Sequence, residues 1–110
     1  MKLIDLDPQF VRFLPEIVVD HMHKREAVQT LNEAQGISFR CPGCVKHDPE
    51  FKHRLCIPFR GRGAPPDENG GHQWDIKGGS NFNDLTLTPS INSVGHWHGF
   101  ITNGEIVGDI

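Results

Sequence analysis

The sequence predicts a small, mostly β domain (small α+β): a short-stranded antiparallel sheet with one short helix and a C-terminal β-hairpin. Twelve glycines and eight prolines among 110 residues favour many turns and short strands over long helices. Asn103-Gly104 stands between two apolar runs and is the preferred two-residue hairpin signal. Residues 41–44, Cys-Pro-Gly-Cys, place two thiols on one tight turn, which predicts a zinc-ribbon-like metal knuckle.

Composition limits what kind of protein the chain can be. Its length suits a single domain over residues 1–110, and with 36% hydrophobic residues the core is modest, so a metal cross-link would add stability. The net charge of −3 argues against nucleic acid as a partner. No run approaches the roughly 18–20 apolar residues of a membrane span, and the first residues lack a signal-peptide core. We therefore expect a soluble, cytoplasmic protein with no membrane partner.

The first third of the chain carries mixed signals. Residues 1–19 alternate loosely and contain two prolines, which predicts one or two short peripheral strands. The polar residues 20–29 predict a solvated connection. A capping box at residues 30–33 predicts a short helix over about residues 26–35.

Apolar alternation predicts four strands in the middle of the chain. A long exposed loop, residues 60–71, follows the second of them. The glycines beside Arg60 and Arg62 in this loop suit the binding of an anion or a phosphate, although a solvated loop is the simpler interpretation. The predicted strands are residues 37–40, 54–59, 73–76 and 85–91.

The Asn103-Gly104 turn sets the register of the hairpin. Thr102 faces Glu105, and further along His98 faces Asp109. Residues directly opposite one another share a face of the sheet. Asp109 is therefore predicted to orient the ring of His98 from the second shell of a metal site.

The strongest chemical signal is a set of four donors, Cys41, Cys44, His96 and His98. A His-x-His pair on a strand directs both imidazoles to the same face, because side chains alternate with period two. Two thiolates and two imidazoles complete the tetrahedral coordination that Zn²⁺ prefers. The sequence therefore predicts a closed zinc site that joins the knuckle to the hairpin.

Other donors can replace one of these four. Cys56 is the alternative ligand, and His47 and His53 lie close to the thiols in sequence. If only three protein groups bind, the open position holds water and the metal becomes catalytic. Three carboxylates are then available as the base: Glu68, Glu105 and Asp109.

Two further kinds of catalytic site fit the sequence less well. A redox C-x-x-C normally begins a helix, and residues 45–49 make a poor helix start. Thr86, Thr88 and Ser90 share one strand face, but no Ser/His/Asp order or nucleophile elbow surrounds them.

Five stretches taken together resemble a family of small, uncharacterised proteins of tailed phages and prophages. The similarity runs over about residues 28–107. Some members carry the label ammonia monooxygenase, but those enzymes are membrane-embedded copper proteins, and this chain has neither a span nor a comparable ligand set. The stretches are TLNEAQGI (30–37), FRCPGC (39–44), FRGRG (59–63), LTLTPSI (85–91) and WHGFITNGE (97–105).

The resemblance implies that Cys41, Cys44 and His98 bind a metal. Several relatives have a cysteine three residues before the final histidine, where this chain has Gly95. The fourth ligand would then be His96 or Cys56. The resemblance also implies a location in the cytoplasm of a bacterial host.

These observations favour a phage-encoded interaction or accessory module with a structural Zn²⁺. Its expected partner is a host or virion protein. The alternative is a zinc-dependent, hydrolase-like enzyme with an open metal position, and we expect a non-enzymatic protein over an enzyme.

Overall fold

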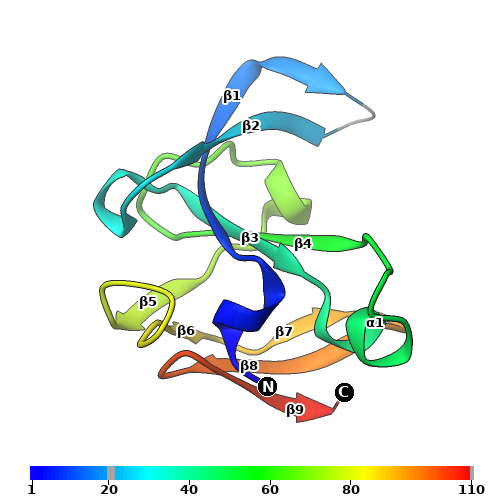
Figure 1. Ribbon diagram of the computed structural model, residues 1–110. Coiled ribbons are helices and arrows are strands. Elements are labelled where there is room, and N and C mark those ends of the chain that lie inside the picture. The colour runs from blue at the N-terminus through cyan, green and yellow to red at the C-terminus, as the bar shows by residue number, and fades with distance from the viewer. Residues whose placement is uncertain (20–21, 110) are drawn as a thin grey trace.

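Short antiparallel strands make up most of the protein (Figure 1), for which the computed structural model describes residues 1–19 and 22–109. The strands are β1 (Gln9–Val19), β2 (Met22–Val28), β3 (Gly36–Arg40), β4 (Arg54–Pro58), β5 (Asp75–Gly78), β6 (Thr86–Thr88), β7 (Ile91–Ser93), β8 (Trp97–Thr102) and β9 (Glu105–Asp109). They form a four-stranded sheet, β2-β1-β3-β4, a two-stranded sheet, β5-β6, and a three-stranded sheet, β7-β8-β9.

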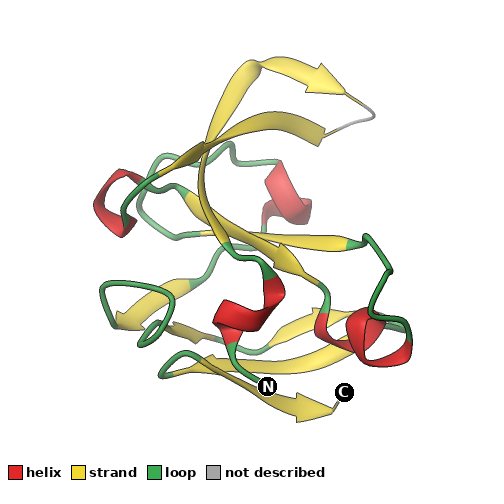
Figure 2. Ribbon diagram, viewed as in Figure 1, coloured by secondary structure: helices red, strands yellow, loops and turns green. Residues whose placement is uncertain are grey.

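Helical structure is short and lies between the strands (Figure 2). The single α-helix of the described residues, α1, spans Pro42–His47 and begins inside the Cys-Pro-Gly-Cys knuckle. Three 3-10 turns, Leu3–Leu6, Leu31–Glu33 and Glu68–Gly71, complete the helical segments. The predicted fold class, a mostly β domain with one short helix, is confirmed. The prediction that residues 45–49 do not continue a helix from the knuckle is wrong, because α1 runs to His47.

One cluster of buried side chains draws on all three sheets. Strand β8 shows why: Trp97, Gly99 and Ile101 are buried, whereas the residues between them are exposed, as expected for a strand with one face on the core. Phe39 of β3 meets Trp97 edge to face, with ring centroids 6.4 Å apart. This contact joins the four-stranded sheet to the C-terminal sheet beside the knuckle.

The C-terminal hairpin has the predicted register. Thr102 pairs with Glu105 and His98 with Asp109. Asn103 and Gly104 both have left-handed φ angles, 50° and 76°, as the two-residue turn requires. The side chain of Asp109 lies outside the described part of the structure, and with it the predicted second-shell role.

Three predictions for the first third of the chain are wrong. The strand within residues 1–19 is neither short nor peripheral, because β1 has 11 residues and lies between β2 and β3 in the sheet. The described part of the predicted connection, from residue 22 onward, is strand β2, which pairs with β1 from Phe10–Val28 to Val19–Met22; residues 20 and 21 lie outside the described residues. The predicted helix over 26–35 is absent, and only the 3-10 turn Leu31–Glu33 forms there. Its capping box does not form either, because the Thr30 hydroxyl donates to the Glu33 carboxylate and makes no cap hydrogen bond. The polar sequence of β2 does not predict a strand. The strand forms because its backbone hydrogen-bonds to β1.

The strands predicted in the middle of the chain are present with changed ends. Strands β3 and β4 confirm the predictions for 37–40 and 54–59, and β5 begins two residues later than predicted. The predicted strand over 85–91 divides into β6 and β7, because the chain bends at Pro89. Ser90 lies in this bend, at the entrance to β7.

Candidate metal centre and serine–histidine pair

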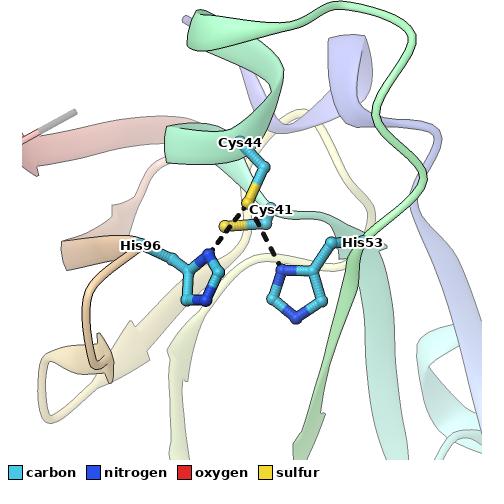
Figure 3. A group of neighbouring side chains, drawn as sticks. All are labelled: Cys41, Cys44, His53 and His96. Carbon is cyan, nitrogen blue, oxygen red and sulfur yellow. Dashed lines mark hydrogen bonds between the residues drawn. The ribbon is translucent and has the colours of Figure 1, made fainter.

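Cys41, Cys44, His53 and His96 converge at one end of the C-terminal sheet (Figure 3). Each offers one ligand atom, and these atoms all lie within 4.8 Å of one another. The Sγ atom of Cys44 is 3.1 Å from Nδ1 of His96 and 3.4 Å from Nδ1 of His53. Two sulfur and two nitrogen donors at such separations fit a single tetrahedral metal ion.

Local backbone contacts bring the four side chains together. Cys41 is the residue before α1, and its amide donates to the carbonyl of His53 at 2.9 Å, which fixes His53 at the start of β4. Cys44 follows in the first turn of α1. His96 lies in the turn between β7 and β8, whose backbone packs against Gly43. Pairing of β3 with β4 and packing of α1 on this turn therefore assemble the site.

Burial shifts the pKa values of two of the donors in opposite directions. Burial, and then the neighbouring Cys41 thiol, raise the pKa of Cys44 to about 11, so a metal must displace its proton on binding. Burial, and then the charge of His96, lower the pKa of His53. The lowered pKa favours the neutral imidazole of His53, which is the form that binds metals.

Three of the four predicted ligands belong to this group, and His98 does not. Strand β8 begins only at Trp97, so His96 precedes it in a turn and the period-two argument does not apply to the His-x-His pair. His53, one of the weighed alternatives, takes the fourth place. Cys56 and His47 lie outside the group, and burial raises the pKa of the Cys56 thiol to about 11.

His98 instead contacts a serine. Its Nε2 atom is 3.2 Å from Oγ of Ser90, across the β7-β8 hairpin. Ser90 is half-buried, and the indole Nε1 of Trp74 donates to its carbonyl at 3.3 Å. A serine hydroxyl within hydrogen-bond distance of an imidazole is the arrangement of an activated nucleophile.

The sequence alone does not predict this pair. In one continuous strand over 85–91, as the alternation predicts, nothing directs Ser90 to His98. The bend at Pro89 starts a new strand, β7, that pairs with β8 from Ile91–Gly99 to Ser93–Trp97. A proline just before a serine, followed by a hairpin with a histidine, is the signal that could have found the pair.

A cavity of about 870 Å³ opens beside Ser90. Its walls come from β4, from the loop before β5 and from β7. Two apolar residues of the wall adjoin Ser90: Ile91 follows it in the chain, and Trp74 donates its indole N–H to the Ser90 carbonyl. Ser90 therefore contacts His98 and is also part of the wall of a space large enough for part of a substrate.

The other predicted site residues have structural partners. The Arg62 guanidinium donates to the carbonyls of Leu31 and Ala34 at 2.8 and 3.1 Å. Arg60 is exposed at the cavity and lies 3.6 Å from the carboxylate of Asp75. Two of the three predicted bases lie apart from the metal ligands: Glu68 is buried at the cavity, 3.5 Å from Arg25, and Glu105 is exposed at the hairpin end. Anion binding by the two arginines stays a prediction.

No helix in the described ranges has both the length and the apolar character that a membrane crossing requires. Neither the curated proteins nor the solved structures contain a match to the sequence. The resemblance to phage proteins stays a prediction. One family model, described as bacterial ubiquitination-like system serine protease (BubE), matches residues 10–108, which is nearly the whole chain. The chain therefore belongs to the BubE family.

Proposed function

We propose that the protein is a serine protease of a bacterial ubiquitination-like system, with Ser90 as nucleophile and His98 as general base. The observation that carries this proposal is the 3.2 Å contact between Oγ of Ser90 and Nε2 of His98. The description of the family, a serine protease, supports it independently. The cavity beside Ser90 supplies room for the acyl part of a substrate.

The geometry supports a two-step acyl transfer. Oγ of Ser90 attacks the carbonyl carbon of the substrate while Nε2 of His98 takes the hydroxyl proton. The bond to the leaving group then breaks, and the departing nitrogen or oxygen receives that proton from His98. In the second step His98 takes a proton from water, the hydroxide attacks the Ser90 ester, and Oγ recovers its proton as the product acid leaves.

We assign a structural role to the metal, which we propose to be Zn²⁺. Two thiolates and two imidazoles are a common donor set for structural zinc. Four protein donors leave no open position for water, which argues against the metal-dependent hydrolase considered from the sequence. In this arrangement the ion ties β3, β4 and the β7-β8 turn together and takes no part in bond cleavage.

Labelling with a small fluorophosphonate tests the assignment of Ser90. The probe phosphorylates an activated serine and needs little else from the site. We expect one label per chain on Ser90 by mass spectrometry and none in Ser90→Ala. In His98→Ala the labelling rate should fall by about 10²-fold or more. Ser93→Ala is the matched control, because Ser93 also lines the cavity and is expected to leave the rate unchanged.

The proposed protease function is contradicted if the folded, metal-loaded protein takes up no label, or if Ser90→Ala takes up as much label as the unchanged protein. The interaction module with a host or virion protein as partner is then the better proposal. Its direct test is retention of a partner from host lysate by the metal-loaded protein and not by the metal-free protein.

A further inference from the structure

Apart from Arg60, the walls of the cavity are built from unbroken runs of residues. They are residues 54–57 of β4, residues 67–74 and residues 89–94, the last of which contains all of β7. Successive side chains of a strand point to opposite faces of its sheet. A cavity that touches every successive residue of a strand therefore lies along its edge and not over one face.

The two strand edges at this cavity are occupied to different degrees. Strand β4 is the last strand of its sheet, but its edge carbonyls have partners: Cys56 accepts from Nδ2 of Asn69 at 3.1 Å, and Pro58 accepts from the amide of Trp74 at 2.9 Å. Strand β7 is the edge strand of its own sheet and, among the described strands, pairs with β8 alone. An edge strand turns every second backbone N–H and C=O away from its neighbour.

The charged residues of the cavity wall are already paired within the protein. Each has an oppositely charged or ionisable neighbour within 4.0 Å. The pairs are Arg54 with Asp7 (3.1 Å), Arg60 with Asp75 (3.6 Å), Asp67 with His23 (2.9 Å) and Glu68 with Arg25 (3.5 Å). Such a wall favours recognition of backbone over recognition of a charged side chain.

We propose that the substrate binds as an extended strand added to the free edge of β7, so that the substrate class is an extended polypeptide segment read through its backbone. Strand β7 begins directly after Ser90, so a segment paired with β7 carries its own carbonyl to the nucleophile. The three residues of β7 span about 10 Å, enough for about three substrate residues. This inference rests on the proposed role of Ser90.

Peptidyl phosphonate esters test the inference on the intact, metal-loaded protein. An alanine tetrapeptide ending in a phosphonate diphenyl ester is compared with the same phosphonate lacking the peptide. We expect the peptide to accelerate modification of Ser90 about tenfold or more. Methylation of one backbone nitrogen in the peptide should remove this acceleration, and methylation of the neighbouring nitrogen should leave most of it, because alternate amides of an added strand face β7.

Two variants distinguish backbone pairing with β7 from binding to a β7 side chain and from binding at β4. Asn92→Ala removes a side chain of β7 but keeps its backbone, so the acceleration should remain. Asn69→Ala releases the Cys56 carbonyl of β4 and should also change nothing. A larger acceleration in Asn69→Ala places the peptide on β4 and overturns the inference.

Two other outcomes separate the inference from the proposed function. Strand addition is wrong if Ser90 reacts with the small fluorophosphonate but the peptide does not accelerate its modification. It is also wrong if methylation at neighbouring nitrogens reduces the acceleration equally. In both cases the proposed role of Ser90 as nucleophile is unaffected. If Ser90 reacts with neither probe, the proposed function itself is overturned.

Discussion

A Cβ atom on Gly43 would lie 1.7 Å from the carbonyl oxygen of His96. The first turn of α1 therefore packs directly on the backbone of the β7-β8 turn, at a place where no side chain fits. This contact brings Cys44 to His96 and couples the knuckle to the hairpin that carries Ser90 and His98.

Replacing Gly43 by alanine should separate α1 from the β7-β8 turn. We expect metal affinity to fall about tenfold or more and the free energy of unfolding to fall by about 1–3 kcal/mol, the usual cost of overpacking. Gly78→Ala is the matched control, because a Cβ atom at Gly78 meets nothing within 4 Å. Chelator competition and thermal unfolding measure both quantities, and equal behaviour of the two variants contradicts the close packing at Gly43.

Two histidine variants distinguish the metal ligands from the proposed base. His53→Ala should lose the bound metal, because His53 supplies one of four donors, whereas His98→Ala should keep one ion per chain. Elemental analysis of untagged protein, purified without chelators, gives the metal content and its identity. Metal lost in His98→Ala and retained in His53→Ala would restore the ligand set expected from the sequence.

Metal affinity should rise with pH. The Cys44 thiol has a pKa of about 11 in the absence of an ion, so it is protonated at neutral pH and releases its proton when the ion binds. Each released proton makes the affinity increase about tenfold per pH unit below that pKa, and the gain ends above it. Competition titrations with a chelator between pH 7 and pH 9 measure the slope. An affinity that does not change over this range is incompatible with ligation by Cys44.

Gly104 should tolerate alanine less well than Gly61 does. Both have a φ of 76°, so alanine costs about 1 kcal/mol of backbone strain at either position. At Gly104 the new Cβ atom would also lie 2.2 Å from the carbonyl oxygen of Asn83, whereas at Gly61 it meets nothing within 4 Å. We expect Gly104→Ala to unfold at a denaturant concentration clearly below that of Gly61→Ala. Equal denaturant midpoints for the two variants would mean that the loop at residue 83 moves away from the new Cβ atom at little energetic cost.

The sequence predicts best what local chemistry determines. The Asn103-Gly104 turn fixes the register of β8 and β9 because its two residues accept left-handed backbone angles. Cys41 and Cys44 are equally local, since one turn of chain holds both thiols. These parts of the fold and of the metal centre need no knowledge of distant residues.

Distant contacts decide what the sequence does not predict. His53 reaches the metal centre through a backbone hydrogen bond to Cys41, which exists only after β3 and β4 have paired. Strand β2 is polar and takes its structure from its neighbour β1. The contact of Ser90 with His98 depends on a change of direction at Pro89 that periodicity does not reveal.

The two groups of functional residues differ in their separation along the chain. Ser90 and His98 are 8 residues apart on one hairpin, whereas Cys44 and His96 are 52 residues apart. Short loops close faster and at a lower entropic cost than long ones. Cys44 and His53 are only 9 residues apart, so we expect the serine–histidine pair and the donors before residue 54 to come together before His96 joins them. A bound ion would then stabilise the native state only after His96 has joined the other three donors. Its loss should shorten the lifetime of the native state more than it alters the turnover of each folded molecule.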